Sequence, residues 1–161
     1  KYPDIVKQID ERGFEIGNHS LNHPKMTNLS KQQMIQEIEE VNKKIKELTN
    51  KTPTLFRPPF GAYNNAVVET VQGLNMHCIQ WSVDSLDWQE KGVDDLVNRT
   101  LKNAKPGGII LFHNNAKYIL DALPKILQTL QKEGYSIVSV GDLIYKDNYY
   151  VDQQGIQRKK T

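Results

Sequence analysis

The sequence predicts an α/β protein in which parallel strands are covered by helices. Short apolar segments that suit buried strands alternate along the chain with longer segments whose apolar residues recur at helical spacing. Such alternation favours parallel strands, because a parallel connection needs a crossover helix. The pattern fits either an open sheet or a closed barrel, and 161 residues suit a single domain.

The first half of the chain contains the clearest helix, at Ser30–Asn50. Ser30 and Gln33 fit a capping box, in which each side chain bonds to a backbone N–H of the first turn. Its apolar stripe consists of Ile35, Ile38, Val41, Ile45 and Leu48. Two further helices are expected at residues 2–12 and 65–72, and each ends at a glycine.

The remaining elements are expected to be short strands and helices in alternation. Strands are predicted at residues 14–16, 54–57, 76–83, 109–112 and 135–140. Helices are predicted at residues 93–104 and 116–132, with Pro124 as a kink or a break in the second of these, and a short helix or turn is predicted at residues 141–145. These elements place the domain at residues 1–145. The polar residues 146–161 follow as a C-terminal tail, either loose or folded into a hairpin that turns near Gly155.

Composition excludes several classes of function. The 21 basic and 19 acidic residues nearly balance, so no electrostatic argument favours nucleic acid or an anionic membrane as partner. The single cysteine, Cys78, excludes an internal disulfide framework and a multi-cysteine metal site. No apolar run approaches the roughly 20 residues that cross a bilayer.

Polar or conformationally unusual residues follow four of the predicted strands. These clusters are His19–His23, Arg57–Gly61, Asp84–Trp88 and His113–Asn114. The carboxyl ends of parallel strands lie at one face of such a fold, and active sites form there. We therefore expect the four clusters to converge on one cleft, although they are far apart in sequence.

The two histidines of the first cluster suggest a metal site. His19 and His23 are four residues apart, so on a brief helical turn both imidazoles face the same way and can share one divalent ion. Two surface histidines in a loop are the alternative. His77 lies within a predicted strand and is expected to be structural.

The second cluster offers a cation and backbone donors. Arg57 is either a surface cation or a fixed guanidinium that orients a carboxylate. The rigid prolines that follow would hold the backbone N–H groups of Phe60 and Gly61 toward the cleft, where such donors can stabilise an oxyanion.

The last two clusters combine carboxylates, an indole ring and an imidazole. Asp84 and Asp87 are either turn formers or functional acids, and Trp88 is either a core residue or a platform for a sugar ring. His113 ends an apolar strand, where a polar residue has no packing reason to lie. A carboxylate near an imidazole favours its protonated form, which suits a general acid.

In this order the clusters resemble the motifs of the polysaccharide deacetylases of carbohydrate esterase family 4, also called the NodB homology domain. The family motifs H(S/T)xxH, RxPxG, DxxDW and LxH correspond to His19–His23, Arg57–Gly61, Asp84–Trp88 and Leu111–His113. The resemblance extends from the start of the chain to about Tyr145. It implies a distorted (β/α) barrel and metal-dependent removal of N-acetyl groups from sugars.

The resemblance also implies roles for individual residues. His19 and His23 would bind the metal, Arg57 would orient the catalytic base, and Phe60 would supply an oxyanion N–H. The other roles fall to residues of the later motifs: Asp87 would hold His113, His113 would protonate the departing amine, and Trp88 and Leu111 would line the acetyl pocket. Zinc is the default metal for a site of two histidines and one carboxylate, with cobalt, nickel and manganese left open.

One family motif is missing from the sequence. The TFDDG motif supplies the family's catalytic base and third metal ligand, and Asp4 and Asp10 do not replace it because they lie on a predicted helix. We therefore expect an N-terminally truncated barrel, a fragment with little or no activity by itself. A smaller departure is Asn114, where the family often has aspartate.

Three functional hypotheses follow. The first is an N-deacetylase of an N-acetylglucosamine-type polysaccharide, such as peptidoglycan, a chitin-like polymer or an exopolysaccharide, acting outside the cell or at its surface. The second is a non-catalytic carbohydrate- or metal-binding domain of the same fold. The third is a structural α/β domain whose polar loops are coincidental.

Overall fold

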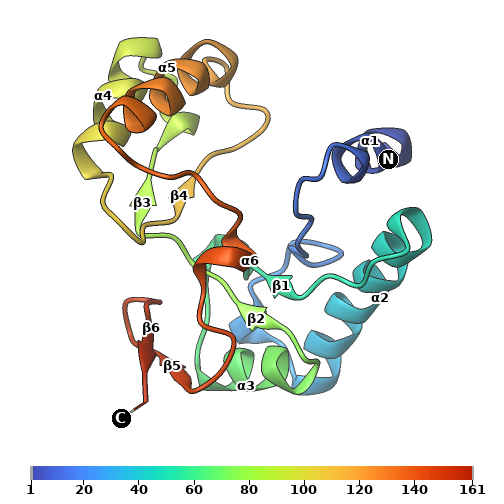
Figure 1. The fold of residues 1–161 in the computed structure, drawn as a ribbon. Coiled ribbons are helices and arrows are strands. Elements are labelled where there is room, and N and C mark those ends of the chain that lie inside the picture. Colours follow the sequence, from blue (N-terminus) through green and yellow to red (C-terminus); the bar gives the residue numbers. More distant parts are fainter. Residues whose placement is uncertain (1, 161) are drawn as a thin grey trace. The chain divides into compact units, whose positions relative to one another are not determined.

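The computed structural model describes residues 2–160, which fold into two compact units (Figure 1). Unit 1 comprises the residues up to Gln80 together with those from Ser139 onward, and unit 2 comprises Trp81–Val138. Helices and short parallel strands alternate along the chain, as expected of an α/β protein. The division into a domain at residues 1–145 and a tail at 146–161 stays a prediction.

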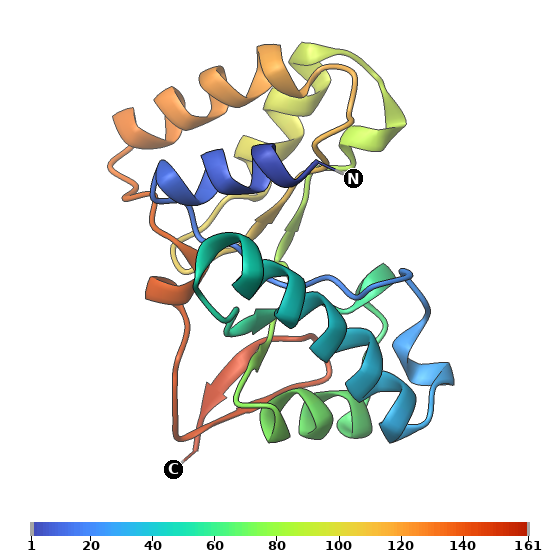
Figure 2. The same cartoon turned by 90° about the vertical axis from the view of Figure 1, so that its right-hand side faces the viewer.

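The helices of unit 1 begin and end close to the predicted positions. They are α1 (Pro3–Glu11), α2 (Lys31–Thr49), α3 (Asn65–Gly73) and the short α6 (Val140–Leu143). Ser30 caps α2, and the capping box with Gln33 is present in both directions. Helix α2 packs against both α1 and α3 (Figure 2), and this packing gives unit 1 its helical layer.

Two parallel strands lie beside these helices. Strand β1 (Leu55–Phe56) pairs with β2 (His77–Cys78), with Leu55 opposite His77. Asn18 continues the pairing on the other side of β1 through a single parallel bridge to Phe56. The helices and strands enclose one apolar core: Met26, Met34, Ile38, Phe56, Val67, Val71, Met76 and Cys78.

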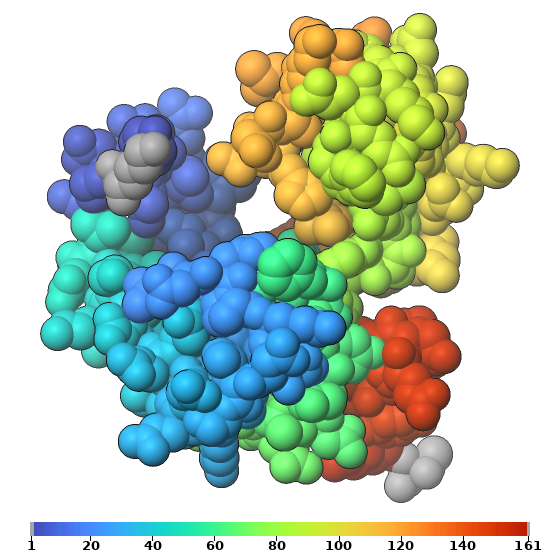
Figure 3. Space-filling view, turned by 180° about the vertical axis from the view of Figure 1, so that it is seen from behind, coloured from blue at the N-terminus to red at the C-terminus, as the bar shows by residue number. Residues whose placement is uncertain are grey.

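The C-terminal residues of unit 1 form the hairpin anticipated near Gly155. Strand β5 (Tyr149–Val151) pairs antiparallel with β6 (Gln157–Lys159). Gly155 turns the chain at φ 78°, and a Cβ there would lie 2.6 Å from the Gln80 side chain, so glycine also permits a close approach. The hairpin, red in Figure 3, lies against the green segment that contains α3.

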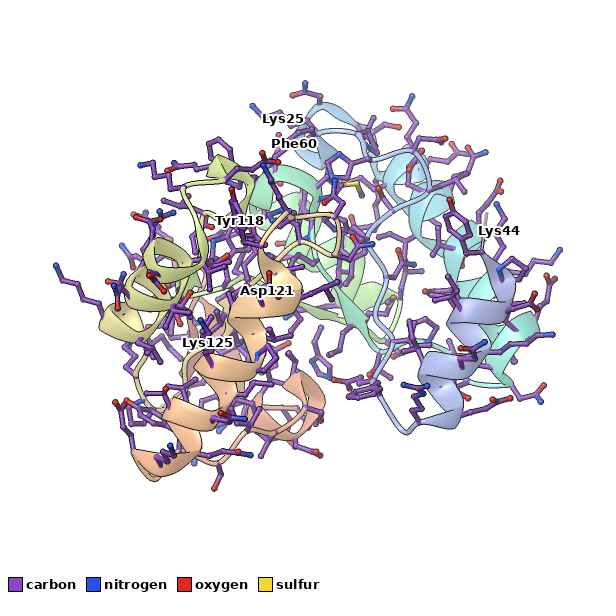
Figure 4. All side chains as sticks on the ribbon, turned by 90° about the horizontal axis from the view of Figure 1, so that it is seen from above. Lys25, Lys44, Phe60, Tyr118, Asp121 and Lys125 are labelled. Carbon is purple, nitrogen blue, oxygen red and sulfur yellow. The ribbon has the colours of Figure 1, made fainter. Side chains whose placement is uncertain are left out.

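Unit 2 repeats the pattern of parallel strands and helices. Strand β3 (Val83–Asp84) pairs with β4 (Ile110–Leu111), and α4 (Val93–Asn103) packs against α5 (Ile119–Lys132). Figure 4 marks Tyr118, Asp121 and Lys125 along the start of α5. The core of unit 2 consists of Leu96, Ala122, Ile126 and Leu130. Helix α5 continues through Pro124, so the predicted break does not occur.

Three strand predictions need correction. Residues 14–16 form no strand, because hydrogen bonding to β1 begins only at Asn18, and Phe14 is exposed. The expected strand at 76–83 is divided between β2 and β3, which belong to different sheets. Residues 135–139 belong to no strand or helix, and Ile137 and Val138 are exposed. Within residues 2–160 the strands form three separate pairs and close no barrel.

Three single turns of 3₁₀ helix complete the secondary structure, and two of them lie in the predicted motif clusters. The turns are Met26–Asn28, Pro59–Gly61 and Asp87–Gln89. No helix in the described part of the chain is long and apolar enough to span a bilayer.

Candidate functional site

The loop that carries the two histidines is fixed at its start by Asn18. This side chain is buried, and its Nδ2 donates to Ile38 O and to Asn42 Oδ1, both at 2.8 Å. Its Oδ1 accepts the Ser20 N–H at 2.8 Å. Asn18 therefore ties the loop to α2, a role that the sequence motifs did not indicate.

Glu37 on α2 holds the middle of the same loop. Its carboxylate accepts the backbone N–H groups of Leu21 and Asn22 and the side-chain amide of Asn22, at 2.7 to 3.0 Å. Burial alone would raise the pKa of Glu37, but these hydrogen bonds outweigh it and lower the pKa below its usual value. The Ser20 hydroxyl accepts the His23 N–H and closes the turn.

The two imidazoles of this loop lie together. The ring centroids of His19 and His23 are 5.0 Å apart, with the planes at 76°. His19 Nδ1 lies 2.6 Å from Arg57 O, and a carbonyl only accepts, so Nδ1 carries the proton and Nε2 the lone pair. That is the tautomer of a metal-binding histidine whose orientation is set by a backbone carbonyl.

The second motif lies against these histidines. The edge of the Phe60 ring contacts His23, with centroids 4.7 Å apart. Phe60 has φ 59° and ψ 8°, and within residues 2–160 its N–H has no hydrogen-bond acceptor. Arg57 is partly buried, and burial lowers the pKa of its guanidinium from the usual value. Unit 1 thus presents two imidazoles, a guanidinium and a backbone donor in contiguous loops.

Unit 2 contains a carboxylate–imidazole pair. Asp87 Oδ1 lies 2.7 Å from His113 Nδ1, and Asp87 Oδ2 accepts the His113 backbone N–H at 2.5 Å. The Asp87 side chain is fully buried, whereas the His113 side chain is 44% exposed. The carboxylate therefore fixes the ring and leaves its Nε2 edge as the part that can meet a reactant.

The loop that supplies Asp87 is held by Arg99 of α4. Arg99 Nη1 donates to Ser85 O and Leu86 O at 3.0 and 3.2 Å, and the same guanidinium pairs with Asp95. Asp84 Oδ1 accepts the Leu86 N–H at 2.9 Å and so acts as a turn former. Arg99 was not recognised from the sequence, because its partners are backbone carbonyls.

Trp88 and Leu111 belong to the same unit as the carboxylate–imidazole pair. Trp88 is 61% exposed, so its ring is a surface feature rather than part of the core. Leu111 ends β4 opposite Asp84 and is partly exposed two residues before His113.

Backbone strain is concentrated in these loops. Eight residues other than glycine have a positive φ within the described residues 2–160, and three of them are asparagines, which tolerate it. The other five all lie in or next to the motif clusters: Ser20, His23, Phe60, Leu86 and Glu90. Strained backbone of this kind is typical of functional loops, where the surrounding fold holds it in place.

The described residues contain no complete set of side chains for a metal site. No group of three or more histidine, cysteine, aspartate or glutamate side chains could hold a metal within residues 2–160. His19 and His23 supply two nitrogen donors, whereas a catalytic zinc needs three protein ligands.

The structure thus brings the predicted residues together in two groups. Unit 1 gathers His19, His23, Arg57 and Phe60, and unit 2 gathers Asp87, Trp88, Leu111 and His113. The convergence of both groups on a single cleft stays a prediction of the sequence.

The chain is similar to known proteins in sequence and fold. Residues 1–79 match the family model of polysaccharide deacetylases. A peptidoglycan-N-acetylglucosamine deacetylase of Bacillus cereus is 41% identical over 147 residues, which cover 88% of this chain and 68% of that protein. The chain belongs to the polysaccharide deacetylase family, carbohydrate esterase family 4.

Other members of the family differ in activity. The peptidoglycan-N-acetylmuramic acid deacetylase PdaA of Bacillus subtilis is 32% identical over 148 residues. A carbohydrate esterase 4 pseudoenzyme of Bacillus anthracis has the same fold, with a TM-score of 0.85 and 30% identity over 90% of this chain. The chain covers only 56% and 51% of these two polysaccharide deacetylase relatives.

Proposed function

We propose that the chain provides part of the active site of a metal-dependent N-deacetylase that acts on an acetylated amino-sugar polysaccharide, peptidoglycan first among them. The hydrogen-bonded pair of Asp87 and His113 carries the proposal, because a buried carboxylate behind a half-exposed imidazole suits a general acid. Two relatives of the chain are named as deacetylases of N-acetylglucosamine and of N-acetylmuramic acid in peptidoglycan.

The chemistry is hydrolysis of an acetamide. Water adds to the carbonyl carbon, a tetrahedral intermediate with a negative oxygen forms, and the C–N bond then breaks. The Phe60 N–H donates to the negative oxygen, and His113 Nε2–H gives its proton to the amine as it leaves. Trp88 and Leu111 line the pocket of the acetyl group, and Arg57 orients the base that takes the proton of the water.

The metal would be held by His19 and His23. A divalent ion at such a site, zinc by default and otherwise cobalt, nickel or manganese, supplies a Lewis acid for the acetamide carbonyl. We expect little or no activity from these residues alone, because the sequence lacks the TFDDG motif that supplies the family's base and third metal ligand. Because such polymers lie outside the cell, we propose that the protein acts outside the cell or at its surface.

The experiment compares variants of the protein encoded by the whole gene. Acetate release from a hexamer of N-acetylglucosamine is measured with zinc present, and His113→Ala is expected to reduce kcat by about 10² to 10⁴ with little change in binding. Unchanged kcat in His113→Ala would remove the acid role. Metal analysis should find about one divalent ion per chain and its loss in His19→Ala. Full retention of the metal in His19→Ala would remove the ligand assignment.

A second candidate is a non-catalytic carbohydrate- or metal-binding domain of the same fold. The observation that favours it is the similarity to the Bacillus anthracis pseudoenzyme. Binding of the hexamer without acetate release by the gene-encoded protein, at saturating zinc, would support this reading over the enzyme.

A further inference from the structure

Unit 1 contains a pocket of about 740 Å³ that is lined mainly by residues outside the motif clusters. Its lining comes from four segments: the loop after His23, the segment from Gly61 to α3, one side of α3, and the hairpin of β5 and β6. We propose that this pocket is a second saccharide subsite, which binds a sugar of the polymer away from the reacting acetamide. The inference rests on the proposed function and adds a binding site to it.

The position of the pocket follows from the motif loops. Lys25 and Thr27 line it and come two and four residues after His23. Gly61 lines it too and directly follows Phe60, whose ring touches His23. Figure 4 marks Lys25 and Phe60 on these two loops. The pocket therefore begins in the same two loops that carry His23 and Phe60, and we infer that a chain of sugars bound at these loops could reach it.

The lining has the chemistry that a neutral sugar requires. Tyr63 and Tyr150 offer accessible aromatic rings, on which the apolar face of a sugar can stack, whereas Tyr149 is buried. Amide side chains donate and accept hydrogen bonds with hydroxyl and acetamido groups, and the lining contains Asn64, Asn65, Gln72 and Gln153.

Charge argues for a neutral ligand rather than an ion. The charged lining residues are two lysines, Lys25 and Lys160, and two acids, Glu69 and Asp152. Because the signs cancel, neither a phosphate nor a divalent cation is favoured. The volume lies within the roughly 300 to 1,000 Å³ of small-molecule sites and has room for a sugar ring and its substituents.

The walls of the pocket are fixed before any ligand arrives. The Tyr63 hydroxyl donates to Asp152 O at 3.0 Å, and the Tyr149 hydroxyl lies 2.9 Å from His77 Nδ1. Asp152 in turn holds its own hairpin through the Ile156 N–H and the Arg158 guanidinium. Rings that are already oriented lose little entropy on binding, which favours a stable subsite.

The test is a titration of the ¹⁵N-labelled protein encoded by the whole gene, without added metal, with the N-acetylglucosamine hexamer, followed by amide chemical shifts. Residues 61–65 and 149–153 should shift. Tyr150→Ala and, independently, Asn65→Ala should each raise the dissociation constant of the hexamer by about fivefold or more, which is the effect of losing one aromatic or hydrogen-bonding contact. Tyr145→Ala is the matched control, because Tyr145 is 46% exposed in the same unit, Tyr150 is 51% exposed, and only Tyr150 lines the pocket.

The outcomes separate this inference from the proposed function. Shifts at the pocket, with weakened binding in both pocket variants and none in Tyr145→Ala, support the subsite even if the gene-encoded protein releases no acetate. Acetate release without shifts at the pocket, or equal weakening in Tyr145→Ala, overturns the subsite and leaves the deacetylase proposal standing.

Discussion

Replacing Asn18 tests how the histidine loop is held. Asn18→Ala removes three side-chain hydrogen bonds, to Ile38 O, Asn42 Oδ1 and Ser20 N, from a residue that is only 2% exposed. Each net hydrogen bond contributes about 0.5 to 1.5 kcal/mol, so the free energy of unfolding should fall by about 2 to 4 kcal/mol. That is a large part of the roughly 5 to 15 kcal/mol of a typical domain.

Asn18→Asp should be at least as harmful as Asn18→Ala. The carboxylate would place an oxygen where Nδ2 now donates, against the oxygens of Ile38 and Asn42, and it would be a buried charge without a partner. Asn65→Ala is the matched control, because Asn65 is exposed, and its effect should stay within about 0.5 kcal/mol.

Urea unfolding measures these differences, and hydrogen exchange locates them. Loss of the Asn18 side chain should speed exchange of the Ser20 amide, since that N–H donates to Asn18 Oδ1. A destabilisation of Asn18→Ala below about 0.5 kcal/mol, or Ser20 exchange as slow as in the parent chain, would refute the reasoning.

Three further predictions concern single side chains. Arg99→Met should lower the stability of unit 2 by about 1 to 3 kcal/mol in thermal unfolding, because two backbone carbonyls lose their donor; an unchanged melting temperature would contradict this. Burial, and then the charge of Lys146, lower the pKa of His77. The stability that neutral His77 contributes is therefore complete above its ordinary pKa of about 6.5. It is lost as the pH falls below that value through the lowered folded pKa, so the free energy of unfolding should drop as the pH falls below about 6.5. His77→Gln should reduce this dependence of the unfolding free energy on pH. An equally steep pH dependence in the variant would show that His77 is not its cause. Burial raises the pKa of Cys78 to about 12, so iodoacetamide at about pH 8 should alkylate the folded chain far more slowly than the chain in urea; equal rates would show the thiol to be accessible.

Helices were predictable from the sequence, whereas strands were less so. The capping box of Ser30 and Gln33 and the apolar periodicity after it are local signals, and α2 begins and ends within one residue of its prediction. A strand depends on a partner elsewhere in the chain. The apolar residues at 135–140 look like a strand but have no partner in the structure, and Val140 instead begins α6.

The residues of the candidate site could be identified from their spacing in the sequence, whereas the residues that hold the site loops in place could not. Clusters after predicted strands identified His19, His23, Asp87 and His113 without any coordinates. Asn18 and the guanidinium on α4 act through contacts that join positions 13 to 24 residues apart, and no local pattern marks such contacts. Only the folded chain reveals which polar residue is buried and what it holds.

The left-handed backbone at Ser20, His23 and Phe60 has a consequence for any attempt to transplant this chemistry. A synthetic peptide with the sequence His-Ser-Leu-Asn-His would relax toward ordinary backbone angles, because residues other than glycine adopt positive φ only rarely unless the surrounding fold holds them there. The sequence of the motif can be copied into another molecule. The backbone conformation that orients its imidazoles depends on contacts with α2 and β1 and is lost without them.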